Sequence, residues 1–319
     1  MVVVWAIALL GFLAASLGSR GVWALELTSR MRQQLEASYV AVAAAEQAMD
    51  ALDADATPHW DGFLDGWAGP AERFNDQPFG QGRFSIAYPD PSAQEGRRFG
   101  LIDEERFLNL NTAPIPVLQR LFRQTGGLKE DEAEAVAESI EDWRDEDHET
   151  QPYGAESFYY LGLADSYECK DGPFENVEEL RLVKGVTAKV FERVAPHVTV
   201  YGSGKVNLNT AGSEVLGALG LSPQGVNGFR FYRDGPDGQP GTADDLVLDS
   251  IGSLASTLGS VLSNDDLNAL LRLDQKKLVT VKSEEFRAII DARTEDSDHE
   301  ARVRCVLTRH GDVRAWEEW

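Results

Sequence analysis

The sequence LNLNTAP at residues 108–114 returns as VNLNTAG at residues 206–212. The shared phrase Asn-Leu-Asn-Thr-Ala begins at Asn109 in the first copy and at Asn207 in the second. The stretch between the copies is acidic, has helical periodicity and contains no recognisable set of catalytic residues. Internal repetition is typical of scaffold architectures. The repeat therefore indicates a built scaffold for interactions rather than an active site.

Both copies carry side chains that can begin a helix. An Asn or Thr side chain accepts a hydrogen bond from a free N–H in the first turn, which stabilises a helix by about 1 kcal/mol. We predict that Thr112 caps a helix over 114–124, near whose start Pro114 presets the φ angle. The residues of this structural motif are Asn109, Asn111 and Thr112 in the first copy and Asn207, Asn209 and Thr210 in the second.

Length and charge limit the classes of function. The chain has 319 residues, 43% of them hydrophobic, which is enough for a substantial core, and we expect two lobes and an N-terminal extension. Its 53 acidic and 30 basic residues give a net charge of -23, which repels a phosphate backbone. An acidic surface suits an extracytoplasmic space and attracts hard cations such as calcium.

Two cysteines, Cys169 and Cys305, lack the short spacing of a zinc or redox motif. They form either one long-range disulfide or two ordinary buried thiols. The sequence leaves both alternatives open, because a bridge requires Cα atoms within about 7 Å.

The N-terminus predicts a membrane anchor. Residues Val2 to Ser19 carry no charge, and about 18 apolar residues are enough for a membrane-spanning helix. A cleaved secretory signal is the alternative, but no basic region precedes the apolar run and helical sequence continues after it. In that continuation a stripe recurs at three- and four-residue steps, which predicts a face for packing on a globular lobe. The stripe comprises Met31, Leu35, Tyr39, Val42, Ala45 and Met49. The whole helix is therefore expected to be a single-pass anchor of the pilin type.

Strand patterns flank a long helical region. Residues 82–90 and 97–111 predict an antiparallel pair of strands, and residues 278–319 return to strand patterns. We therefore predict an α+β fold in which a pilin-like N-terminal helix lies on an antiparallel sheet that a large α-helical insertion interrupts. The expected parts are the anchor and helix (1–53), the first part of the β domain (54–110), the insertion (111–271) and the completing strands (272–319).

The insertion contains a helix-hairpin-helix pattern. In LRLVKGVTAKV, residues 180–190, an apolar pair precedes Gly185 at the hairpin and an apolar helix follows. Such hairpins often bind nucleic-acid phosphates through backbone N–H groups. Thr187 stands where a second glycine would help, and the surroundings are acidic. We therefore do not expect nucleic-acid binding, and a membrane-anchored DNA receptor is the competing interpretation.

The chain resembles a known family through LNLNTAP, SIEDWRDEDHETQPYGAESFYY, FENVEELRLVKGVTAKVFERVAPHVTVYG and GKVNLNTA. These segments are similar to those of minor pseudopilin K of type II secretion systems. The resemblance implies a pilin-like fold with an inserted helix-hairpin-helix or SAM-like domain, and a place at the tip of the periplasmic pseudopilus. It also implies minor pseudopilins I and J as partners, a single-pass anchor in the inner membrane, and calcium in the helical domain of some members.

Two features depart from the family pattern. The family has a short basic leader ending in Gly, whereas this chain starts inside the apolar run. Either the start codon is misassigned or the leader is absent, so the sequence names no cleavage site. In related pseudopilins a glutamate early in the helix pairs with the N-terminal amine of a neighbour. Here the first acidic residue is Glu26. A subunit without that acid offers no acidic partner to a subunit above it, which fits a terminal position.

Acidic residues near the end of the first predicted helical pair form a candidate cation site. In EDWRDEDHE, residues 141–149, six of nine side chains are carboxylates. Calcium takes about 6 to 8 oxygen ligands, and it would offset the repulsion among so many anions. The predicted ligands are Asp142, Asp145, Asp147 and Glu156. The alternative is a solvated acidic helix end with Arg144 as its internal counterion.

A second acidic cluster lies in DGPDGQPGTADDLVLD, residues 234–249. Its flexible backbone could wrap a calcium ion, although Pro236 stands at the second ligand position of an EF-hand pattern. The candidate ligands are Asp234, Asp237, Asp244 and Asp245. A polar surface turn is the alternative.

Catalysis is not expected. The five histidines are scattered without metal-ligand spacing, and the sequence has no nucleophile elbow, P-loop or dinucleotide fingerprint. Carboxylate pairs could serve acid–base hydrolysis, but nothing in the sequence fixes a pair within a cleft. We predict a structural protein and no catalytic residues.

Overall fold

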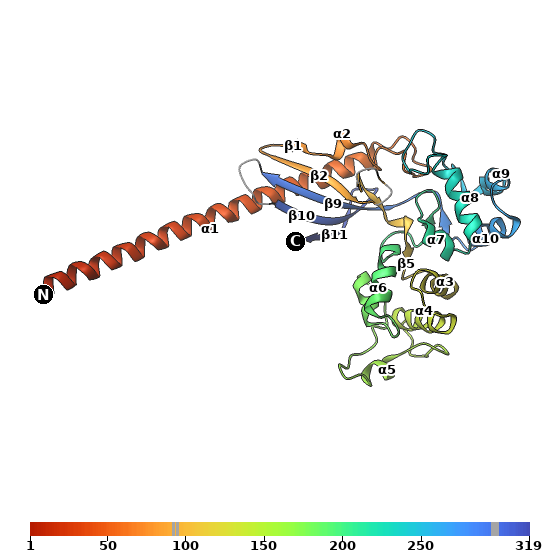
Figure 1. The fold of residues 1–319 in the computed structure, drawn as a ribbon, viewed down its shortest axis with the longest axis horizontal. Coiled ribbons are helices and arrows are strands. Elements are labelled where there is room, and N and C mark those ends of the chain that lie inside the picture. Colours follow the sequence, from red (N-terminus) through yellow and green to blue (C-terminus); the bar gives the residue numbers. More distant parts are fainter. Residues whose placement is uncertain (91–92, 94–95, 295–299) are drawn as a thin grey trace.

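A computed structural model of the chain describes residues 1–90, 93, 96–294 and 300–319. Within the first helix it describes all side chains except those of residues 13–15, 17–22 and 24–25. The predicted mixed fold, a long N-terminal helix with an antiparallel sheet, is confirmed (Figure 1).

Helix α1, Val2–Asp53, is continuous over 52 residues, and its N-terminal half projects far beyond the sheet (Figure 1). Large apolar side chains at its start, among them Trp5 and Phe12, are exposed. Within the described residues, no helix is both long enough and apolar enough to cross a membrane. The predicted span, Val2 to Ser19, includes residues 13–15 and 17–19, whose side chains lie outside the described part.

The sheet is antiparallel and runs in the order β1, β2, β9, β10, β11. Short strands β3 and β4 pair with β2 and β9. The bounds are β1 Gln77–Phe79, β2 Gly82–Pro89, β3 Arg97–Phe99, β4 Ile102–Asp103, β9 Glu285–Thr294, β10 Glu300–Thr308 and β11 Val313–Glu318, with helix α2 at Ala71–Phe74. Burial alternates along β9, as expected for a strand with one covered face. Strands lie on both sides of the helical region as predicted, but the strand predicted over 97–111 is divided into β3, β4, a 3-10 turn at Glu104–Arg106 and a two-residue strand at Leu108–Asn109.

The buried face of α1 is not the predicted stripe. Met31, Leu35, Tyr39 and Val42 are exposed, and only Ala45 and Met49 of the stripe pack on the sheet. The buried side chains are mostly small: Ala37, Val40, Ala41, Ala44, Ala45, Ala48, Ala51 and Leu52. At Gly82 an added Cβ would lie 2.6 Å from a methyl of Val40, so helix and strand approach closely. Small side chains are therefore the ones that fit against the sheet, and the larger apolar ones face outward.

Between β4 and β9 the chain forms a mostly helical stretch, residues 108–281, which we call the helical segment. Its elements are β5 Leu108–Asn109, α3 Ile115–Gln124, α4 Glu130–Arg144, α5 Ser157–Leu161, α6 Ala188–Val194, β6 Val198–Thr199, β7 Val206–Asn207, α7 Ser213–Ala218, α8 Pro223–Arg233, α9 Leu254–Leu258, α10 Asn264–Gln275 and β8 Val279–Thr280. The 3-10 turns are Glu104–Arg106, Val177–Leu182, Ala195–His197 and Ile251–Ser253. Its hydrophobic cluster runs from Leu108 to Val281, apart from the cluster beneath α1. The predicted insertion, 111–271, lies within it.

The two Asn-Leu-Asn-Thr-Ala phrases fold alike. Each begins in a short parallel strand pair, β5 with β6 and β7 with β8. The first Asn then accepts the N–H two residues on, at 2.8 Å for Asn109 and 3.0 Å for Asn207. This turn uses the side-chain oxygens that we expected to cap a helix, so the capping prediction is wrong. The N-cap positions are instead Pro114 and Gly212, and Thr112 donates to the Gly204 carbonyl.

The second Asn of each phrase holds a returning loop. The Asn111 amide accepts from the Phe174 N–H and donates to its carbonyl, at 2.7 and 3.0 Å. Asn209 makes the same two bonds with Leu248, at 2.9 and 3.0 Å. The sequence repeat therefore marks a repeated structural unit in which a strand, two helices and a returning loop are held together.

Candidate metal centre

Helix α4 fixes the first acidic cluster. Ile140 and Trp143 bury one face of the helix, and Asp142 is fully buried beside them. At the helix end Arg144 donates to the carbonyls of Leu110 and Ala113 in the first repeat. The chain then leaves the helix at Asp145 and returns to begin α5.

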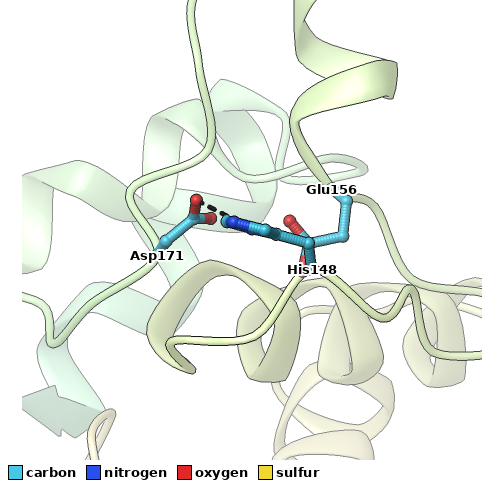
Figure 2. Close-up of side chains that lie close together, drawn as sticks. All are labelled: His148, Glu156 and Asp171. Carbon is cyan, nitrogen blue, oxygen red and sulfur yellow. Dashed lines mark ion pairs between the residues drawn. The ribbon is translucent and has the colours of Figure 1, made fainter.

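Four carboxylates, those of Asp142, Asp145, Glu156 and Asp171, converge where the chain returns to begin α5. His148, Glu156 and Asp171 each offer a ligand atom, and these atoms lie within 4.8 Å of one another (Figure 2). His148 Nδ1 lies 3.2 Å from Asp171 Oδ2. Asp142 and Glu156 are at least nine-tenths buried. The buried oxygens without a hydrogen-bond partner are Asp142 Oδ2, Asp145 Oδ1, both oxygens of Glu156, and Asp171 Oδ1.

The electrostatics of the cluster favour an added cation. Burial, together with the charges of Asp147 and Asp142, raises the pKa of Asp145 to about 6. Burial likewise raises the pKa of Asp142 and of Glu156. Arg144 is ion-paired with Glu141, so its charge is already engaged beside the cluster. Desolvated anions in mutual repulsion are what a bound divalent cation would stabilise.

The atoms of the cluster that could bind a metal are mainly carboxylate oxygens, which hard cations prefer. Asp142 is oriented by the Gln151 N–H, which lies 3.0 Å from Oδ1 and leaves Oδ2 for a ligand. Burial raises the pKa of the nearby Cys169 thiol to about 12. The four carboxylates are the hard oxygen donors that calcium prefers.

Of the predicted ligands, Asp142, Asp145 and Glu156 lie close enough for their charges to raise one another's pKa, and their role as ligands stays a prediction. Asp147 is exposed and accepts the Glu149 N–H at 2.8 Å. Asp171 and His148 were not predicted. Asp171 arrives from the returning loop that Asn111 holds at Phe174, and its φ of 50° is uncommon for a residue other than glycine. No spacing pattern in the sequence near Asp171 indicates that its side chain joins this cluster.

The second acidic cluster is only partly assembled. Asp234 is buried and lies 2.6 Å from Arg233 and 3.0 Å from Arg230, so it is already neutralised. Asp237, Asp244 and Asp245 place carboxylate oxygens within 4.8 Å of one another. Each of the three already accepts a hydrogen bond within the loop. The predicted set of four is therefore reduced to three.

A third acidic group lies at the junction of the sheet and the helical segment. Asp55, Asp61 and Asp65 also bring oxygens within 4.8 Å of one another. Arg309 donates to Asp55 at 2.9 Å and pairs with Asp61. Burial raises the pKa of Asp61 to about 7, and Arg309 opposes that rise. The arginine already supplies the cation at this junction.

The cysteines do not form a bridge. Cys169 and Cys305 are both free and buried, one in the cluster of the helical segment and the other in the cluster beneath α1. Of the two alternatives that the sequence left open, the structure has the pair of thiols.

Gly185 lies in the turn between the 3-10 turn Val177–Leu182 and α6. Gly185 has a φ of 85°, and an added Cβ would lie 2.7 Å from a methyl of Val136. Thr187 caps α6 by accepting the Val190 N–H at 3.3 Å. Thr187 therefore serves the helix start rather than a phosphate.

Comparison with known proteins identifies this region. Residues 101–203 match the family model described as Type II secretion system (T2SS), protein K. The match contains the first repeat, the candidate metal centre and the hairpin, and it ends before the second repeat.

Curated relatives carry the same name. Type II secretion system protein K of Aeromonas hydrophila is 35% identical over 120 residues, which are 36% of each chain. The Klebsiella pneumoniae protein is 26% identical over 216 residues, 66% of this chain and 64% of the relative. The Pseudomonas aeruginosa protein is 32% identical over 155 residues, 48% of this chain and 44% of the relative. The matches thus cover less than two thirds of each protein K relative.

One solved structure has the same fold. A chain of the GspK-GspI-GspJ complex from the enterotoxigenic Escherichia coli type 2 secretion system superimposes with a TM-score of 0.71. The alignment covers 92% of this chain and 99% of that chain at 18% identity. The likeness to that chain extends the shared fold from the matched region to nearly the whole molecule. These matches give the DNA-receptor interpretation no support.

Proposed function

We propose that the chain is a minor pseudopilin of a type II secretion system, placed at the tip of the periplasmic pseudopilus with minor pseudopilins I and J. In this role it supports pseudopilus assembly and protein secretion, and it performs no catalysis. Its N-terminal helix anchors it in the inner membrane and the rest lies in the periplasm. The family match of residues 101–203 and the fold of a chain from the GspK-GspI-GspJ complex support this assignment.

The structural feature that supports this proposal most directly is the exposed part of the apolar stripe on α1. Tyr39 is 70% exposed and Val42 45% exposed, on a helix whose other face is already packed. Beside them a groove of about 710 Å³ runs along α1 to Arg73 and Phe79. An apolar helix face next to a groove is a typical docking surface for an amphipathic helix. We propose that this surface receives the N-terminal helix of another pseudopilin.

Co-elution with the partners tests the assembly. The fragment from Glu26 onward keeps both hydrophobic clusters, because their members lie between Ala37 and Leu307. We expect this fragment to form a ternary peak in size-exclusion chromatography with the soluble domains of pseudopilins I and J from the same genome. Tyr39→Ser should weaken the peak, whereas Phe231→Ser, at an exposed phenylalanine on α8, should leave it unchanged. Separate peaks for the unaltered proteins, or equal loss in both variants, would contradict the proposed surface.

We further propose that Asp142, Asp145, Glu156 and Asp171 bind one calcium ion that rigidifies the helical segment. The five buried, unpartnered oxygens support this site. The loop with Asp237, Asp244 and Asp245 is a second candidate, supported by the proximity of its carboxylates. Thermal unfolding of the fragment in calcium and in chelator tests the proposal, and equal melting temperatures would reject it.

We also infer that the helical segment contains an inserted domain of the helix-hairpin-helix or SAM-like kind, for which the sequence predicted the bounds 111–271. Its separate hydrophobic cluster supports this division. Limited proteolysis should release a resistant fragment with ends near residues 105 and 283. Rapid cleavage throughout that region would contradict an independent domain.

A further inference from the structure

An exposed apolar surface lies at the end of the helical segment farthest from the sheet, around α5 (Figure 1). Phe158 is 95% exposed, and Tyr153, Leu161, Leu163 and Leu182 are exposed as well. We call these five residues the tip patch. Single exposed apolar residues are ordinary, but a group of five that includes an almost wholly exposed phenylalanine indicates an interaction surface.

The tip patch is held by buried aromatic rings. Tyr160, on the inner face of α5, is fully buried and stacks on Tyr167 with ring centroids 5.3 Å apart. Trp143 meets Tyr160 edge to face, also at 5.3 Å. The Ser157 hydroxyl accepts the Cys169 N–H at 2.9 Å. Because Tyr160 fills the inner face of α5, Phe158 is fixed facing solvent and is preorganised for a partner.

Two contacts join neighbouring segments to α5. Lys184 Nζ donates to the Tyr153 carbonyl at 3.0 Å and lies 5.1 Å from the ring of Tyr159. The Tyr167 hydroxyl donates to the Leu182 carbonyl at 2.7 Å. Tyr153 and Leu182 are thereby brought beside α5, so the tip patch draws on three stretches of the chain.

Acidic residues outnumber basic ones in the stretches that form the tip patch. Residues 141–190 contain 13 acidic and five basic residues, one of which is Lys184 beside Tyr159. The exposed acids among them, which we call the carboxylate rim, are Glu146, Asp147, Glu149, Asp165, Glu168, Glu175 and Glu178. Such a rim repels anionic lipid headgroups, and a second copy of a chain with net charge -23 is repelled as well. A basic protein surface is attracted.

We propose that the tip patch binds a partner protein whose docking surface has an apolar centre flanked by Lys and Arg. Phe158 enters an apolar pocket of the partner, and the surrounding carboxylates face its basic residues. An aromatic anchor within a polar rim is the usual arrangement of a binding hot spot. This surface is distinct from the stripe on α1 and goes beyond the proposed assembly with pseudopilins I and J.

Two fluorescent peptides test the charge and the anchor together. Both carry the same Leu-Phe-Leu centre, but one is flanked by lysines and the other by glutamates. Fluorescence anisotropy measures their binding to the fragment from Glu26 onward, to its Phe158→Ser variant and to the matched control Phe231→Ser. We expect the lysine-flanked peptide to bind at least about tenfold more tightly than the glutamate-flanked one. Phe158→Ser should weaken that binding about tenfold or more, and Phe231→Ser should not change it.

Other outcomes would overturn the proposal. Equal binding of both peptides would show that the carboxylate rim does not select a basic partner. Unchanged binding to Phe158→Ser would show that Phe158 is not the anchor. Phosphatidylcholine vesicles provide the remaining arm of the test. Co-sedimentation with these vesicles that Phe158→Ser abolishes, without peptide binding, would assign the tip patch to a membrane and reject a protein partner. Matching melting temperatures of the variants establish that each is folded.

Discussion

Arg144 and Arg233 occupy equivalent positions in the two repeats, because each guanidinium donates to the carbonyls of the leucine and the alanine of its own Asn-Leu-Asn-Thr-Ala phrase. An aspartate follows each arginine. In the second repeat Asp234 is held by Arg230 and Arg233, whereas Asp145 Oδ1 in the first has no partner. The second repeat thus neutralises its aspartate with arginine side chains, whereas the first leaves an unpaired carboxylate oxygen, at which we propose a calcium ion.

This difference predicts opposite effects of Asp145→Asn with and without calcium. In chelator the substitution removes a repelled carboxylate, so we expect a higher melting temperature than that of the unaltered protein. In calcium it removes a ligand, so the stabilisation should shrink from the about 2.7 kcal/mol expected at 100 times the Kd. Differential scanning calorimetry in both buffers measures the two shifts. Asp165→Asn, at an exposed aspartate outside both proposed calcium sites, is the control. A lower melting temperature of Asp145→Asn in both buffers would argue against a cation site.

Stability in chelator should depend on pH through the same residue. The pKa of Asp145 is raised to about 6, chiefly by burial, so the folded state binds this proton more tightly than the unfolded state. The stabilisation is complete below the ordinary carboxylate range and is lost as the pH rises through about 6. Burial also raises the pKa of Asp61 to about 7 and that of Glu105 to about 8, and these groups act in the same direction.

The contribution of Asp145 is therefore the difference between the unaltered protein and Asp145→Asn, measured by urea unfolding between pH 4 and 7. Asn does not titrate, so the variant should lose less stability as the pH rises. Parallel curves for the two proteins would show that Asp145 has no raised pKa. Calcium should reverse the trend, because protons compete with the ion below about pH 6.

The two repeat arginines should differ in their contribution to stability. Arg233→Met leaves the buried Asp234 with Arg230 as its remaining ion-pair partner, so we expect a loss of about 3 kcal/mol in the free energy of unfolding. Arg144→Met frees the half-buried Glu141 and two carbonyls, for which about 1 to 2 kcal/mol is expected. Urea unfolding at pH 7 measures both. An equal or larger loss for Arg144→Met would contradict the comparison.

The sequence predicted the positions of helices and strands better than it predicted which of their side chains are buried or cap a helix. Periodicity placed the strands on both sides of the helical segment, and helix α4 has the expected buried positions at Ala133, Val136 and Ile140. Thr112 failed as a helix cap because the preceding Asn109 side chain forms its own turn. Which of several possible local hydrogen bonds forms depends on the tertiary structure around the chain segment.

The residues of the candidate metal centre could likewise be predicted only in part from the sequence. Asp142, Asp145 and Glu156 could be predicted because they lie close together in one acidic stretch. Asp171 could not, because its place depends on the long-range pair between Asn111 and Phe174. Ligands that lie within one stretch are visible in a single sequence, and those delivered by tertiary contacts are not.

The error about α1 leads to the last prediction. Large apolar residues were expected to face the sheet, yet the close approach at Gly82 selects alanines there. Ala44→Leu should therefore destabilise the fragment from Glu26 onward by about 1 to 3 kcal/mol, because a fully buried position has no room for the added methyl groups. Tyr39→Ser should leave the free energy of unfolding within about 0.5 kcal/mol, since its side chain is exposed. Urea unfolding separates the two faces, and a large loss from Tyr39→Ser would mean that the stripe packs on its own sheet after all.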